Sequence, residues 1–242
     1  MKRFFLLYFL GLLLFSCAQN PTQVKKQLQT PLNNSTSFEI KGTLENFYSK
    51  KVYLNKIIET SIYPIDSSEI INNHFKFIGI VKFPERFALT FENYSSITPF
   101  IIENTPLNII INSKAITDPL ITGSPLNTKL NDYKTTSKNI FKKIDYLFPQ
   151  FQKARLENDA EKLRFIGNEM KNIEHEFVEF SYQYILQNKD SYVSAMILRD
   201  QLKSSTIDTL RVGKMYKILS EEVKKSPDAQ IISSFLKITL KN

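Results

Sequence analysis

The residue with the clearest chemical role is Cys17, the only cysteine among 242 residues. A single thiol excludes an intrachain disulfide, and it excludes the C-x-x-C pair that thiol–disulfide exchange requires. The chemistry left to Cys17 is that of one isolated nucleophile. We therefore expect its sulfur to be committed to a covalent modification rather than to redox work.

The residues before Cys17 have the order of an export signal. Two basic residues at positions 2 and 3 precede an apolar run of about a dozen residues, and the small Ser16 follows that run. The run is shorter than the roughly 20 residues that cross a bilayer. The segment Leu14 to Cys17 resembles the lipobox of bacterial lipoproteins, although Phe15 is bulkier than the residue usually found there. This resemblance implies that the signal is removed and that the thiol of Cys17 is acylated.

Lipid attachment would decide where the protein resides. Two or three acyl chains hold a protein on a membrane stably, whereas one chain holds it only marginally. We expect residues 1–17 to be a lipoprotein signal, with the mature chain anchored in the cell envelope and facing the periplasm or the cell surface. The outer membrane is the expected membrane. The alternative is an ordinary signal peptide with Cys17 as a bystander, or an uncleaved anchor.

The two histidines, His74 and His175, are about a hundred residues apart. No second cysteine and no H-E-x-x-H spacing accompanies them, so a zinc site would depend on a coincidence of tertiary structure. Solvated or hydrogen-bonded histidines are the simpler interpretation. We expect no metal site.

Other catalytic patterns are also missing from the sequence. There is no G-x-S-x-G elbow for a serine hydrolase, and the glycines are not clustered as in a phosphate-binding loop. Glu174, Glu176 and Glu179 could serve as the acid and base of a glycosidase, but acidic residues on the outer face of a helix are normally just solvated. We expect no catalytic residue, no cofactor and no enzymatic activity.

The charge of the chain excludes one class of partner. The formal net charge is +8, from 32 basic and 24 acidic residues, and no basic block is longer than two. A mild, dispersed surplus more often keeps a surface soluble than binds a polyanion. We expect no nucleic acid partner, while contact with an anionic membrane surface stays open.

Residues 37–123 have the pattern of short strands. Apolar residues alternate from Phe38 onwards, and Asn72-Asn73 has the composition of a tight turn. About seven strands follow one another without a helix-length segment between them, and a direct parallel crossover needs a dozen residues or more. The pattern predicts an antiparallel β-sandwich or partial barrel. Gly42 and Gly79 fall inside predicted strands and indicate bulges or close approach of another stretch of backbone.

Residues 124–242 have the period of helices. Apolar residues recur at spacings of three and four from Leu130 to Phe151 and again from Leu156 to Tyr184, which predicts two long helices, with Pro149 kinking or ending the first near Phe148. An intrachain helical hairpin is the expected arrangement, and a homodimer through the same stripes is the alternative.

Shorter segments complete the predicted organisation. Three short helices should follow the hairpin, opened by Asp190 or Ser191, by Ser205 or Thr206, and by Ser226-Pro227. Residues 18–36 are rich in Gln, Asn, Thr, Ser and Pro, which is typical of a flexible tether. The chain is therefore divided into a signal (1–17), a tether (18–36), a β domain (37–123) and a helical region (124–242).

The order of these parts is similar to a known family. It resembles a domain of unknown function that precedes thioredoxin-like domains of the TlpA/AhpC type in envelope lipoproteins of Gram-negative bacteria. The resemblance rests on the segments Phe38-Glu39-Ile40-Lys41-Gly42-Thr43-Leu44, Ile65-Asp66-Ser67, Asn73-His74-Phe75-Lys76-Phe77, Ile121-Thr122-Gly123-Ser124 and Asn188-Lys189-Asp190-Ser191-Tyr192. In those relatives the C-x-x-C pair lies in the downstream domain, which is absent from this sequence.

These observations favour a membrane-anchored envelope lipoprotein that acts as a non-catalytic interaction or ligand-binding module. The resemblance implies an envelope protein as partner, for example one in thiol–disulfide or stress handling. The alternative function is the N-terminal accessory part of a thiol–disulfide oxidoreductase whose thioredoxin-like domain is missing or encoded separately.

Overall fold

The computed structural model describes residues 36–58, 61–204 and 207–239. The predicted signal with Cys17, and the predicted tether except for its last residue, lie outside the described residues. The predicted helix cap at Ser205 or Thr206 also lies outside them.

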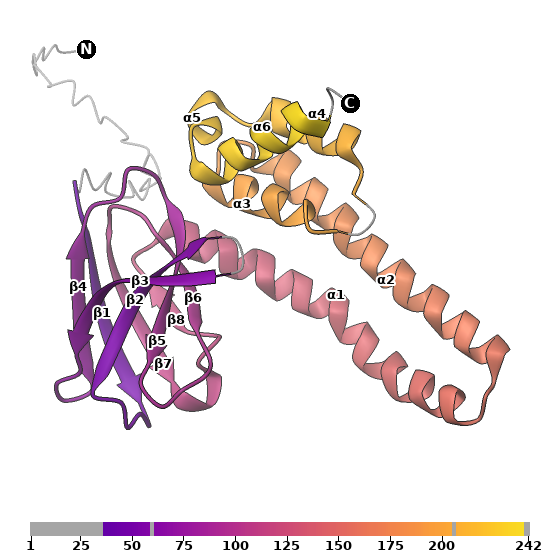
Figure 1. Ribbon diagram of the computed structural model, residues 1–242, viewed down its shortest axis with the longest axis horizontal. Coiled ribbons are helices and arrows are strands. Elements are labelled where there is room, and N and C mark those ends of the chain that lie inside the picture. Colours follow the sequence, from indigo (N-terminus) through magenta and orange to yellow (C-terminus); the bar gives the residue numbers. More distant parts are fainter. Residues whose placement is uncertain (1–35, 59–60, 205–206, 240–242) are drawn as a thin grey trace, which may run out of the picture. The chain divides into compact units, whose positions relative to one another are not determined.

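The β domain consists of two four-stranded sheets (Figure 1). Sheet A has the strand order β4-β1-β7-β8, and sheet B has the order β3-β2-β5-β6. The inward side chains of both sheets form one hydrophobic core, so the domain is a β-sandwich, and the predicted α+β fold class is confirmed. The strands are β1 (Phe38–Glu45), β2 (Lys51–Ile58), β3 (Ser61–Glu69), β4 (His74–Gly79), β5 (Glu85–Phe91), β6 (Thr98–Ile102), β7 (Pro106–Asn112) and β8 (Leu120–Thr122).

One strand pair differs from the expected antiparallel pattern. Strands β1 and β7 are parallel, with Ile40 opposite Leu107 and Gly42 opposite Ile109. The expectation of antiparallel pairing rested on the short connections between consecutive strands. Strands β1 and β7 are not consecutive, and β2 to β6 between them provide enough chain for a parallel crossover. The short strand β8, paired with β7, was not predicted.

Two phenylalanine rings explain the strand glycines. In the antiparallel pair of β1 and β4, Phe75 lies opposite Gly42 and Phe38 lies opposite Gly79. A Cβ atom on Gly42 would lie 2.0 Å from the ring of Phe75, and one on Gly79 would lie 2.6 Å from that of Phe38. The predicted bulge or close backbone approach is therefore wrong for both glycines, because the register of the pair is continuous and an aromatic side chain occupies the space above each glycine.

The helical region begins with the predicted hairpin of α1 (Pro125–Leu156) and α2 (Ala160–Gln187), which run side by side (Figure 1). Ser124 and Asp159 cap the two helices through their side chains. The predicted helix end near Phe148 is wrong, because α1 continues through Pro149 for two further turns. Ala154 is fully buried in this continuation, so packing compensates for the one hydrogen bond that the proline cannot make.

Four shorter helices follow: α3 (Tyr192–Gln201), α4 (Thr209–Ile218), α5 (Glu221–Lys224) and α6 (Pro227–Thr239). Ser191 caps α3 as predicted, whereas Asp208 caps α4, and α5 was not predicted. Seven of the ten residues of α3 are buried, and five of them belong to a second hydrophobic core, which also includes Ile101 from β6. Among the helices of the described ranges, none combines the length and the apolar character needed to cross a membrane.

Candidate functional site

The first turn of α1 is joined to the edge of sheet B by one side chain. Strand β6 is an edge strand, and the backbone N–H of Ile101 donates to Asn127 Oδ1 at 2.9 Å while Asn127 Nδ2 donates to the carbonyl of Ile101 at 2.7 Å. Asn127 thus satisfies both backbone groups of Ile101 as a neighbouring strand would. Because all four groups are buried, this pairing fixes α1 against β6.

A carboxylate reinforces the same joint. Glu103, just after β6, accepts hydrogen bonds from the Ser124 hydroxyl at 2.5 Å and from the backbone N–H of Leu126 at 3.1 Å. Unpaired N–H groups and the helix dipole both favour a negative charge at a helix N-terminus. The beginning of α1 is therefore held at a defined position beside sheet B.

An ion-pair network joins sheet B to α3 and α6. Arg86 of β5 donates to both carboxylate oxygens of Asp200 at 2.9 and 2.8 Å, and to Asp228 at 3.1 Å. Arg199 donates to the same Asp228 at 2.7 Å. Burial alone would lower the pKa of Arg86, but the charges of Asp200 and Asp228 outweigh burial and raise this pKa above its ordinary value. Both arginines thus have carboxylate partners.

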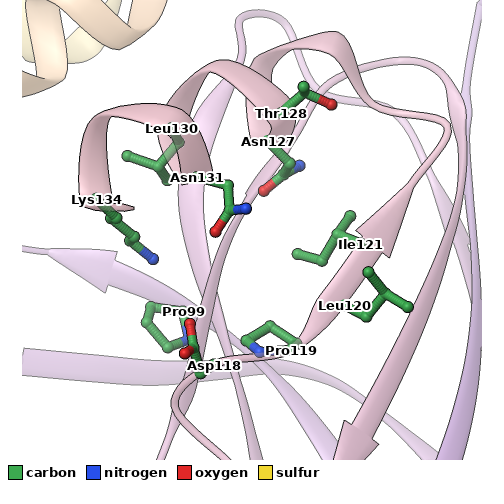
Figure 2. Close-up of a pocket in the computed structure, with 10 residues that line it drawn as sticks. All are labelled: Pro99, Asp118, Pro119, Leu120, Ile121, Asn127, Thr128, Leu130, Asn131 and Lys134. Carbon is green, nitrogen blue, oxygen red and sulfur yellow. The ribbon is translucent and has the colours of Figure 1, made fainter. Parts of the chain in front are cut away.

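Two cavities lie at this junction of the sheet and the helices, and we call them together the junction site. The first has a volume of about 160 Å³, and Figure 2 shows Asn131 and Lys134 of α1 facing Asp118, Pro99 and Pro119 across it. The second has a volume of about 320 Å³ and is bounded by β5, β6, α1 and α3. Pro99, Leu130 and Lys134 line both cavities, so the two adjoin.

Lys134 has an unusual electrostatic position in the junction site. It is half-buried, and its ammonium group forms no hydrogen bond or ion pair with any residue in the described part of the chain. Burial lowers the pKa of Lys134, and the nearby charge of Asp118 opposes that shift. Asp118 is itself paired with Lys138 at 2.7 Å. The junction site therefore contains a desolvated cation without a direct counter-ion.

The two histidines singled out in the sequence lie in different parts of the fold. His74 begins β4, where its Nδ1 lies 3.2 Å from the hydroxyl of Thr43, and His175 lies on α2. Within the described residues, no group of three or more His, Cys, Asp or Glu side chains is arranged to hold a metal ion. Neither histidine contributes to the junction site.

Two of the three glutamates considered as an acid–base set, Glu174, Glu176 and Glu179, have different partners. Glu176 pairs with Lys143 of α1 at 2.6 Å, and Glu179 pairs with Arg211 of α4. The hydrogen bonds from Arg211 lower the pKa of Glu179, which favours its charged form. Glu179 and His175 line a groove of about 570 Å³ between α2 and α4, which we call the α2–α4 groove.

The sequence reasoning missed the residues that form the junction site. Asn127 lies three residues after the cap Ser124, a position at which an asparagine does not by itself indicate a tertiary contact. Lys134 neighbours Tyr133 of the apolar stripe and resembles any solvated lysine beside a helix seam. The only available signal was that β6, as an edge strand, needs a partner, since an edge strand must be covered or paired.

Comparison with known proteins identifies one part of the chain. Residues 38–130 match a family described as a domain of unknown function, DUF4369, which confirms the predicted resemblance to such a domain. The match covers all eight strands and the first turn of α1, including Asn127. No curated protein matches the chain.

Proposed function

We propose that this protein is a lipid-anchored component of the bacterial cell envelope whose folded body binds a small ligand in the junction site without transforming it. The observation that carries the proposal is a cavity whose walls are fixed from both sides. Asn127 holds α1 to β6, and Arg86 holds β5 to α3 and α6. Rigid walls with few convergent polar groups are typical of ligand sites.

The anchor is supported by the segment Leu14 to Cys17, and it is tested in cells. We expect wild-type protein to incorporate an alkyne-labelled fatty acid and to sediment with membranes. The Cys17→Ser variant should incorporate no label. Wild-type protein that carries no label or stays in the soluble fraction would contradict the anchor.

Ligand binding is tested by a thermal-shift screen of the full chain in detergent against a library of charged and neutral small molecules. Leu130 lines both cavities, so Leu130→Trp should fill the site and abolish the shifts. Leu210→Trp, at an exposed position of α4, is the matched control and should retain them. The absence of any shift, or shifts equal in the Leu130→Trp variant, would refute the binding function.

The second proposal is an accessory role for a thiol–disulfide oxidoreductase. It is supported by the match of residues 38–130 to a domain of unknown function, the kind of domain that the sequence resembles. Reading the genomic DNA downstream for a C-x-x-C domain separates this proposal from the first. An envelope protein encoded there would also be the first partner to test for association.

A homodimer through the helices is a further proposal. The stripe residues Ile140, Ile166 and Ile173 are buried within the chain, whereas Phe148 and Phe165 are exposed on the same hairpin. These two rings, together with the exposed Tyr146 and Leu156, are apolar positions of the hairpin that could contact a second copy. Sedimentation velocity of wild-type protein and of the Phe165→Ser variant tests this contact.

A further inference from the structure

We infer that the ligand of the junction site is a small monoanion with an apolar body, such as a carboxylic acid, whose carboxylate pairs with Lys134. This inference rests on the proposed binding function and adds the chemical class of the ligand. It follows from three features of the site: an unpaired cation, a surplus of positive charge and apolar walls.

The first feature is the state of the cations around the larger cavity. Arg86, Lys134, Arg199 and Lys203 line it, with Asp200 as the acidic residue of the wall. Arg86 and Arg199 are satisfied by Asp200 and by Asp228 behind the wall. Four cations and two carboxylates thus leave a surplus of two positive charges, and Lys203 reaches Asp200 only at 4.0 Å.

The surplus is concentrated at Lys134. Asp118 could serve as the counter-ion of Lys134, but it lies on the opposite wall of the smaller cavity and pairs with Lys138 instead. Holding an ammonium group away from water without a partner is costly, whereas a bound anion restores the lost interactions. A neutral ligand would displace water from Lys134 and leave that cost in place.

The same site disfavours a more highly charged ligand. Phosphate groups are usually held by several free donors, such as an open helix N-terminus or a guanidinium fork. Here Glu103 occupies the N-terminus of α1, and both arginines are engaged. Lys203 is 58% exposed and lies near Asp200, so Lys134 is the one sheltered ammonium group, and it balances a single negative charge.

The walls decide what the rest of the ligand must be. Phe100, Leu130, Met196 and Ile197 line the larger cavity together with the cations. Its volume of about 320 Å³ is near the lower end of the range of about 300–1,000 Å³ for small-molecule sites. The cavity therefore suits a compact ligand with an aromatic or short aliphatic body rather than a peptide.

The inference is tested with 3-phenylpropionate and its neutral counterpart 3-phenylpropanamide, using the full chain in detergent. Binding is followed by isothermal calorimetry and by NMR of ¹³C-labelled methionine methyl groups. Met196 lines the cavity and Met170 does not, so the resonance of Met196 should shift while that of Met170 stays fixed. We expect the amide to bind at least about tenfold more weakly than the acid.

Two lysine variants separate the charge of Lys134 from general surface charge. Lys134→Met keeps the length and apolar stem, and it should weaken binding of the acid at least about tenfold. Lys142→Met, two turns further along α1 at an exposed position that lines neither cavity, should bind as the wild type does. Melting curves monitored by circular dichroism establish that both variants are folded.

Three results would overturn the inference: equal binding of acid and amide to the wild type, unchanged binding to a folded Lys134→Met variant, or no binding of the acid up to its solubility limit. The acid–amide comparison uses wild-type protein alone, so it holds even if a variant is unstable. If neutral library compounds bind the wild type but not the Leu130→Trp variant, the proposed binding function stands and only the anionic character of the ligand is refuted.

Discussion

The junction site and the α2–α4 groove each present a basic side chain to a cavity, but they differ in whether an acidic side chain pairs with it. In the groove, Arg211 pairs with Glu179, its Nη2 donating at 2.7 Å, and the guanidinium lies 3.9 Å from the ring centre of Tyr182. In the junction site, Lys134 has no such partner among the described residues. The fold neutralises the first cation internally and leaves the second available to a ligand.

The two regions also differ in how their walls are held. The groove lies among helices α2, α3 and α4, whereas the junction site lies between a sheet and helices joined by buried polar contacts. Fixed walls around an uncompensated charge favour selective binding, because little reorganisation is needed when the ligand enters. The comparison therefore favours the junction site over the larger groove as the place for the proposed ligand.

The largest effect should come from Asn127→Ala, which removes the joint between α1 and β6. The backbone N–H and carbonyl of Ile101 would be left buried and unpaired, at a cost of roughly 1–3 kcal/mol each. We expect the free energy of unfolding to fall by about 3 kcal/mol, measured by urea denaturation. Asn131→Ala, at an exposed position one turn later, should change it by less than about 0.5 kcal/mol.

The next effect should come from Asp228→Asn, which breaks the ion-pair network behind the junction site. Asp228 is only 6% exposed, so its loss leaves two partly buried arginines without full compensation. We expect a loss of about 2 kcal/mol in urea denaturation, below the range for fully buried pairs because both arginines reach solvent. Asp200→Asn is the control, since its side chain is 43% exposed, and should cost about 1 kcal/mol or less.

Gly42→Ala should lower stability without touching the junction site. The added methyl group would lie 2.0 Å from the ring of Phe75 and would force that ring to shift, at a cost of about 1–2 kcal/mol. Binding of 3-phenylpropionate should remain at the wild-type level in the folded variant. Lost binding in Gly42→Ala would show that affinity follows overall stability rather than the local charge of Lys134.

The smallest effect should be found in the α2–α4 groove, where the pair of Glu179 and Arg211 is partly exposed. Hydrogen bonds from Arg211 lower the pKa of Glu179, so the pair stabilises the fold above the ordinary pKa and loses this contribution as the pH falls through the lowered pKa. Glu179→Gln should cost less than about 1 kcal/mol at neutral pH. The difference from wild type should vanish in strong acid, which unfolding curves at several pH values would show.

The sequence predicted those features that depend on local pattern. Alternation from Phe38 located the strands, three–four spacing located the hairpin, and Ser191 marked the start of α3. Features that depend on distant parts of the chain could not be predicted in this way. The parallel pairing of β1 with β7 depends on how five intervening strands divide between two sheets.

The candidate site could not be predicted because its character depends on which partners other residues choose. Among the described residues Lys134 has no partner because Asp118 engages Lys138, and one wall of the cavity beside it is fixed because Asn127 reaches Ile101. Each of these residues is ordinary in its local context. The proposed anchor at Cys17 is the reverse case, since its prediction needs only four consecutive residues and the apolar run before them.

The most direct measurement is the pKa of Lys134, followed through its ¹³Cε resonance with and without 3-phenylpropionate. Burial should hold this pKa below its ordinary value in the free protein, and the bound carboxylate should raise it, because an anion favours the ammonium form. Affinity should then fall as the pH rises through the pKa of Lys134. A Lys134 resonance that titrates at the ordinary pKa, and that the acid does not move, would contradict an anion site at the junction.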